Sequence, residues 1–201
     1  MPNLYIYIGG ILLAASAIVL QFGFANMFDI STVQWFSQHR TPVLDALTQV
    51  FALMGGMPFV SILTVLWCLY FLLKQQYGLV LFIVAGIIGS IIIGWSLKWA
   101  IDRPRPEVIY AIVKSYGPSF PSAHSLYAAT LVSLGACIYR KQNVYWVALG
   151  ILWWFTMGIS RIYAGVHFPT DVFAGWGLGF LWIALLWQLR LRINQNALGL
   201  F

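Results

Sequence analysis

The chain has 201 residues, of which 61% are hydrophobic and only 8% are charged, and its formal net charge is +6. An ordinary soluble domain has about 25% charged residues, so this composition excludes a water-soluble globular protein and indicates an integral membrane protein. The ten tryptophans and ten tyrosines suit the aromatic belts at the two membrane interfaces. They therefore give no reason to expect a nucleic-acid partner.

Six apolar stretches follow one another along the chain, each long enough to cross about 30 Å of hydrocarbon. They cover residues 4–25, 46–73, 77–100, 121–139, 144–162 and 170–189. The predicted fold class is thus all-α, a bundle of six transmembrane helices that forms a single domain over residues 1–201. We expect the first stretch to be an uncleaved span, because no basic residue precedes it and it exceeds the apolar core of a signal peptide.

The second apolar stretch is the least regular of the six. Gly55, Gly56 and Pro58 predict a break or kink in its middle. Residues 42–53 are expected to form a separate piece at the membrane interface. Residues 29–40, which combine aromatic with polar side chains, are expected to lie at the interface as well.

The basic residues between the stretches predict the orientation of the bundle. In a six-span arrangement one side carries five cations and no acid: Lys74, Arg140, Lys141, Arg190 and Arg192. The opposite side carries six cations and all five acids, a net charge of 6 − 5 = +1. The positive-inside rule therefore predicts that both termini are cytoplasmic.

Three short polar segments interrupt the apolar sequence and hold the candidate functional residues. They cover residues 98–106, 121–125 and 160–171. In the six-span arrangement all three fall at the outer ends of spans. Polar groups are costly beside hydrocarbon, so function is the default reason for keeping them there. We therefore expect one composite site that opens on the outer membrane face.

The first polar segment suits the binding of a phosphate. Lys98 and Arg105 flank a turn that Pro104 and Pro106 make rigid. The arginine offers a bidentate fork and the lysine a point charge. A basic cluster at the end of a span is an equally good explanation of these two cations by themselves.

The second polar segment reads as the start of a helix. Pro121 is expected at the first helical position, which places Ser122, Ala123 and His124 in the first turn. Free backbone N–H groups and the helix dipole make such a turn an anion site. The alternative is simple capping by Ser119 or Ser122, with His124 an interfacial imidazole, and this alternative is compatible with anion binding.

The third polar segment contains Arg161, His167 and Asp171. The spacing from His167 to Asp171 lets the carboxylate reach one ring nitrogen and leaves the other nitrogen free to attack. Asp171 could instead be only a favourable charge at a helix N-terminus. That alternative explains neither His167 nor Arg161.

Together the segments resemble the three-part signature of the type 2 phosphatidate phosphatase superfamily. Its parts here are Lys98, six residues, Arg105-Pro106; Pro121-Ser122-Ala123-His124; and Ser160-Arg161, five residues, His167, three residues, Asp171. The signature runs over residues 98–171. The family includes integral membrane lipid phosphatases and soluble vanadium haloperoxidases. It usually has glycine at the position of Ala123, a departure that we expect to tune rather than abolish activity.

The resemblance implies a role for each residue. His167 is the expected nucleophile, Asp171 orients it, and His124 protonates the leaving oxygen. The residues expected to bind the phosphoryl oxygens are Lys98, Arg105, Ser122, Ala123 through its N–H, and Arg161. No metal and no other cofactor is expected. The implied substrate is a lipid phosphate or diphosphate, such as phosphatidylglycerophosphate, undecaprenyl diphosphate or phosphatidate, in a bacterial cytoplasmic membrane.

Two other functions remain open from the sequence. A transporter for an anion or a lipid also places charges within a membrane, although here they gather at span ends. A haloperoxidase-like activity is the other alternative, which a lipid-facing body disfavours. The oligomeric state is open, but Gly175 and Gly179 favour close helix packing inside the bundle over a dimer.

Overall fold

The structure, a computed structural model, describes residues 2–21, 24–139 and 144–197. This part of the chain contains eight α-helices, joined by loops and one 3₁₀ turn, so the all-α prediction is confirmed. The helices are α1 Pro2–Gln21, α2 Phe24–Gln38, α3 Pro42–Met54, α4 Met57–Leu73, α5 Tyr77–Ile101, α6 Ala123–Ile138, α7 Val144–Tyr163 and α8 Pro169–Ala197. The 3₁₀ turn η1 covers Val108–Tyr110.

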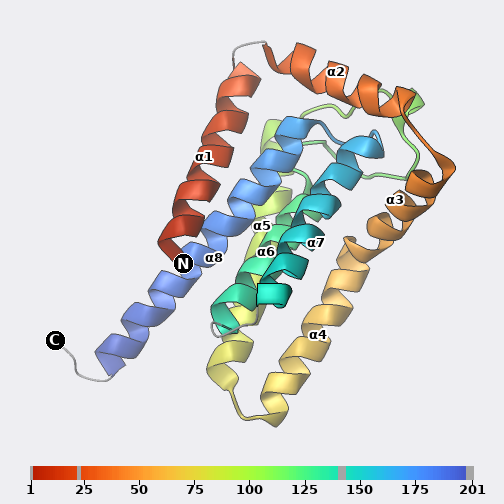
Figure 1. The fold of residues 1–201 in the computed structure, drawn as a ribbon. Helices are drawn as coiled ribbons and strands as arrows, with labels where there is room; N and C mark the ends of the chain where they lie inside the picture. The colour runs from red at the N-terminus through yellow and green to blue at the C-terminus, as the bar shows by residue number, and fades with distance from the viewer. Residues whose placement is uncertain (1, 22–23, 140–143, 198–201) are drawn as a thin grey trace.

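Helix α8 runs through the bundle and packs against α1 on one side and α6 on the other. Helix α2 lies across one end of the bundle, whereas the beginning of α1 and the end of α8 point away from it (Figure 1). The connections from α5 to α6 and from α7 to α8 both lie at the α2 end (Figure 1). The three polar segments therefore meet at this end.

The six-span prediction is met only in part. By length and composition, two helices of the described chain can each cross a membrane, α5 and residues Pro169–Ile193 of α8. Helices α3 and α4 pass the same test together, although they are bent by 53° at their junction. The apolar parts of α1 and α6 are shorter, and α7 is not among the clear spans. Helices thus occupy all six predicted stretches, but only two or three of them qualify as spans.

The predicted break in the second stretch is confirmed. Helix α3 ends at Met54, Gly55 is its C-cap, and Gly56 is the N-cap of α4. Residues 29–40, expected at the interface, fall mostly within α2 and form a helix of their own. Helix α1 covers residues 4–21 of the first stretch, residues 22–23 lie outside the described part of the chain, and α2 begins at Phe24.

Glycines on two faces of α8 allow close approach of its neighbours. A Cβ atom at Gly175 would lie 2.6 Å from the carbonyl oxygen of Ser122, and one at Gly177 would lie 2.8 Å from that of Gly9. Gly179 meets α6 in the same way, which confirms that the glycine pair packs inside the bundle. The tight α6–α8 contact also lets the Ser122 N–H donate to the Asp171 carbonyl at 3.0 Å.

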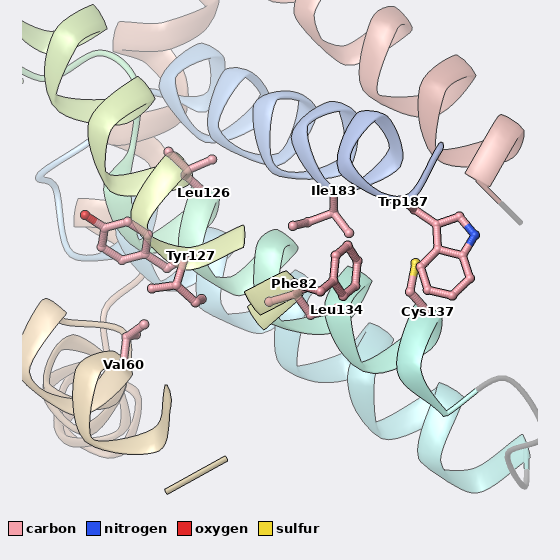
Figure 2. Packing of buried hydrophobic residues seen from close by; sticks show 9 residues of the cluster. Val60, Phe82, Leu126, Tyr127, Leu134, Cys137, Ile183 and Trp187 are labelled. Atoms are coloured by element: carbon pink, nitrogen blue, oxygen red, sulfur yellow. The ribbon is translucent and has the colours of Figure 1, made fainter. Parts of the chain in front are cut away.

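The main apolar core lies between α5, α6 and α8 (Figure 2). Leu134 and Ile183 are fully buried in it, and both would collide with a side chain at Gly86. Cys137 also lies in this core, as expected for a small packing residue. This cluster fixes the three helices whose ends carry much of the polar site.

Candidate active site

A cavity of about 290 Å³ lies where the polar segments meet, next to the break between α3 and α4. Six of the eight predicted site residues line it: Lys98, Arg105, Ala123, His124, Arg161 and His167. No carboxylate is among its lining residues. The other two predicted residues, Ser122 and Asp171, are fully buried outside the lining.

The remaining lining is largely apolar. It includes Ala52 of α3, Met57 and Pro58 of α4, Trp95 of α5 and Tyr127 of α6. The cavity thus combines cationic and imidazole groups with hydrocarbon and aromatic surface. Such a cavity suits a ligand that carries an anionic group on an apolar body.

Lys98 and Arg105 bind the loop that precedes α6. The Lys98 Nζ donates to the carbonyl of Pro118 at 2.7 Å. The guanidinium of Arg105 donates to the carbonyls of Tyr116 at 2.8 Å and Val166 at 2.7 Å. Arg105 therefore joins this loop to the segment before His167, and part of its donor capacity is used by the fold itself.

Arg161, at the end of α7, is 1% exposed. Its Nε and Nη2 atoms donate to the Ser160 hydroxyl at 3.2 and 3.1 Å, and Nη2 also donates to the Thr48 carbonyl in α3. Within the described residues its Nη1 makes no hydrogen bond. A buried guanidinium held on one side has a free edge that can bind an anion in the cavity.

Helix α6 begins later than predicted. Ser122 is its N-cap and Ala123 its first residue, so Pro121 does not open the helix. The reason is that serine caps well, because its hydroxyl accepts from the first turn: here Ser122 Oγ accepts from the Ser125 N–H and, at 2.9 Å, from the Ser125 hydroxyl. Capping is therefore the role of Ser122 in this structure.

His124 lies against the break between α3 and α4. Its Nε2 is 3.1 Å from the carbonyl oxygen of Ala52. A carbonyl can only accept, so Nε2 carries the proton. The absence of a side chain at Gly55 makes this position possible, because a Cβ there would lie 2.6 Å from His124 Cδ2.

His167 lies in the loop between α7 and α8, and Gly165 shapes that loop. Gly165 has φ +69°, and a Cβ at this position would overlap the backbone of Tyr110. Only glycine satisfies both conditions. The Ile112 N–H donates to the Ala164 carbonyl at 3.0 Å and joins the loop between α5 and α6 to the loop between α7 and α8.

The two ring nitrogens of His167 have different neighbours. Nε2 is 3.3 Å from Arg105 Nη1, and Nδ1 is 3.4 Å from Asp171 Oδ2 without the alignment of a hydrogen bond. Arginine has no acceptor, so Nε2 presents its lone pair and Nδ1 carries the proton. Burial lowers the pKa of His167 to about 3, although the contact with Asp171 opposes this effect. The ring is thus neutral, with a nucleophilic nitrogen beside the cavity.

Asp171 is held by groups that the sequence did not single out as functional. Its Oδ2 accepts from the Ser119 hydroxyl and from the Phe168 N–H, and its Oδ1 accepts from Arg103 Nη1 at 2.6 Å. From the sequence, Ser119 is only a possible cap. Arg103 was an outer cation two residues from Arg105 in a proline-rich turn, and that position is the one signal that could have identified it.

Asp29 of α2 is a further buried member of this network. Its Oδ2 lies 2.7 Å from Arg103 Nη2 and accepts from the Thr170 hydroxyl at 2.6 Å. From the sequence, Asp29 is one polar residue in an interfacial segment. Nothing in its local context indicates a partner that is 74 residues away along the chain.

Comparison with known proteins decides the family. A sequence model described as the PAP2 superfamily matches residues 77–195, more than half of the chain. The chain belongs to the PAP2 superfamily. This superfamily of membrane lipid phosphatases is the one that the three motifs predict, so the resemblance is confirmed. All eight predicted site residues lie within the matched range.

Individual relatives agree with this assignment. The PAP2 chain is 30% identical over 165 residues to undecaprenyl-diphosphatase of Sulfolobus acidocaldarius, over 79% of this chain and 76% of that protein. It is 34% identical over 105 residues to the bacitracin transport permease protein BcrC of Bacillus licheniformis. That match covers 52% of this chain and only 50% of the relative, so the chain aligns with about half of that protein.

A solved structure confirms the architecture of the PAP2 chain. It is similar to the transmembrane PAP2 type phosphatidylglycerolphosphate phosphatase from Bacillus subtilis, with a TM-score of 0.79 and 26% sequence identity. The similarity covers 96% of both chains. The protein is therefore an integral membrane protein with the helical fold of the transmembrane PAP2 phosphatases.

Proposed function

We propose that the protein hydrolyses a lipid phosphate or diphosphate at the membrane surface, through a phosphohistidine formed on His167. The observation that carries the proposal is the cavity, which gathers four cations and two histidines against an apolar wall. The cations are Lys98, Arg105, Lys114 and Arg161. The cations suit the phosphoryl group, and the apolar wall suits the lipid attached to it.

The proposed first step transfers the phosphoryl group to the enzyme. The lone pair of His167 Nε2 attacks phosphorus, and the bond from phosphorus to the lipid oxygen breaks. His124 enters this step as an imidazolium, and its Nδ1 proton passes to that leaving oxygen while Nε2–H stays on the Ala52 carbonyl. Asp171 faces the Nδ1 proton and stabilises the positive charge that the His167 ring acquires. Arg161 and Lys98 hold the equatorial oxygens, whose charge redistributes in the transition state.

The proposed second step returns the enzyme to its starting state. Water attacks the phosphohistidine, the phosphorus–nitrogen bond breaks, and inorganic phosphate forms. His124, left neutral by the first step, accepts the proton of the attacking water at Nδ1 and becomes the imidazolium again. No metal ion is part of this cycle.

The substrate class rests on the relatives and on the shape of the cavity. The names of two relatives indicate undecaprenyl diphosphate and phosphatidylglycerophosphate as their substrates. Both molecules present a terminal phosphoryl group on a long apolar body. We propose substrates of this kind and, from the positive-inside charge distribution, a site that faces outward with both termini cytoplasmic.

Transport and haloperoxidase chemistry have less support. The permease name of the Bacillus licheniformis relative raises a transport role, but the cations around the cavity gather at one end of the bundle. The apolar wall favours a lipid substrate over the small substrates of a haloperoxidase.

The test is phosphate release from purified lipid phosphates and diphosphates with EDTA present. We expect release to continue after chelation and to disappear in the His167→Ala variant. A water-soluble phosphate ester serves as the comparison substrate. Loss of activity with EDTA would contradict the metal-independent mechanism, and strong preference for the soluble ester would contradict the lipid substrate.

A further inference from the structure

Three side chains of alternating charge form a buried row from α2 to the first turn of α8. Asp29 Oδ2 lies 2.7 Å from Arg103 Nη2, and Arg103 Nη1 lies 2.6 Å from Asp171 Oδ1. Both carboxylates are fully buried, and the arginine side chain is 11% exposed. The guanidinium thus uses its two terminal nitrogens to bridge two carboxylates.

Thr170 forms hydrogen bonds with two members of this row, Asp29 and Arg103. Its hydroxyl donates to Asp29 Oδ2 at 2.6 Å and accepts from Arg103 Nη1 at 2.7 Å, while its N–H donates to Asp29 Oδ1 at 3.1 Å. The Phe168 ring covers the guanidinium, whose central carbon is 4.4 Å from the ring centroid. Both oxygens of Asp29 are therefore occupied, and the planar fork of Arg103 has little freedom to rotate.

The charges of the row have a consequence for His167. Arg103 and Asp171 alone would sum to zero and would offer little to a cationic ring. With Asp29 the sum is −1 + 1 − 1 = −1. Buried charges are weakly screened, so this net charge acts on the neighbouring Nδ1 proton more strongly than it would in water.

We propose that Asp29 is a positioning residue for phosphoryl transfer. Acting through Arg103 and Thr170, it holds Asp171 Oδ2 toward His167 and keeps a net negative charge there when the ring becomes cationic. Asp29 does not line the cavity, so it touches neither the nucleophile nor the substrate. This inference rests on the proposed phosphohistidine chemistry.

The decisive variant is Asp29→Asn, which keeps the shape of the side chain and removes its charge. We expect the rate of phosphoenzyme formation, measured by rapid quench with a labelled lipid phosphate, to fall about ten- to a hundredfold, with KM changed less. Asp45→Asn is the matched control, because Asp45 accepts a hydrogen bond from Tyr163 at 2.7 Å and is not part of the row. We expect the control to react at the wild-type rate.

A second readout separates positioning from a purely structural role. Vanadate mimics the transition state of phosphoryl transfer, whereas inorganic phosphate resembles the product. We expect Asp29→Asn to weaken inhibition by vanadate at least about fivefold more than inhibition by phosphate. A structural role would lower the thermal midpoint and the active fraction but would leave the ratio of the two inhibition constants unchanged.

Thr170→Val tests the same inference in a variant that keeps all three charges of the row. It removes the hydroxyl that bridges Asp29 and Arg103, and we expect a smaller change of the vanadate-to-phosphate ratio in the same direction. If Asp29→Asn does not fold, an unchanged ratio in Thr170→Val overturns the inference. A wild-type protein that hydrolyses lipid phosphate without any phosphohistidine overturns the proposed chemistry. A wild-type phosphohistidine that Asp29→Asn forms equally fast overturns only the role of Asp29.

Discussion

The polar end of the bundle and its apolar core are built by different forces. At the α2 end, fully or almost fully buried polar groups such as Asp29, Arg161 and Asp171 are fixed by directed hydrogen bonds. Between α5, α6 and α8, the side chains of Leu134 and Ile183 are held by apolar packing (Figure 2). Change at the polar end should therefore alter chemistry, and change in the apolar core should alter stability.

The largest expected effect is on chemistry at the polar end of the bundle. His167→Ala removes the proposed nucleophile and should lower kcat by at least about a thousandfold, while the thermal midpoint changes little. The control is His39→Ala, because His39 stacks on Trp35 with ring centroids 4.4 Å apart and lies outside the cavity lining. A labelled phosphoenzyme in His167→Ala would show that the nucleophile is another residue.

In the apolar core the expected effect has the opposite character. Leu134→Ala leaves a cavity beside Gly86 and should lower the free energy of unfolding by about 2 to 5 kcal/mol, with kcat per folded molecule unchanged. Reversible unfolding in detergent micelles measures the first quantity, and turnover of the folded fraction the second. Leu185→Ala, at a half-exposed position, is the control. If kcat per folded molecule fell by a factor that corresponds to the same free energy, the distinction between the polar end and the apolar core would be lost.

Gly55→Ala tests the contact between the helix break and the site. The added methyl would lie 2.5 Å from Met157 Sδ and 2.6 Å from His124 Cδ2, so His124 must move. Misplacement of a proton donor should lower kcat about tenfold, and more for poor leaving groups than for good ones. Gly135→Ala, where a Cβ meets nothing within 4 Å, should leave kcat unchanged. An equal loss with both leaving groups would argue against His124 as the proton donor.

The smallest expected effect is that the ring of His167 does not titrate near neutral pH. Because burial lowers the pKa of His167 to about 3, its ring should stay neutral between pH 4 and 8. The chain has three histidines, so the variant with His39→Asn and His124→Asn reports His167 alone through its ¹⁵N chemical shifts. The unfolded chain binds this proton near pH 6.5, so the contribution of His167 to stability is present above that pH. It decreases as the pH falls toward 3. A midpoint near 6.5 in the folded protein would show that the ring is hydrated.

Short-range patterns in the sequence predicted most of the candidate site. Lys98, Arg105, His124, Arg161 and His167 were identified from motif spacing, and the structure places all five around one cavity. Helices lie in all six stretches that hydropathy located, and Gly55 and its neighbours located the break. These predictions succeeded because helix periodicity, proline and glycine act within a few residues.

Only the tertiary structure revealed the support behind the site. The bonds from Asp29 to Arg103 and from Asp29 to Thr170 join residues that are 74 and 141 positions apart, and no local pattern encodes such a pairing. Hydropathy likewise counted six spans, whereas the part of the chain that the structure describes has two or three clear ones and a helix that lies across the bundle end. The sequence by itself determined which side chains can perform the chemistry. Their orientation and charge balance follow from long-range packing, because a buried charge is tolerated only where distant segments bring it a partner.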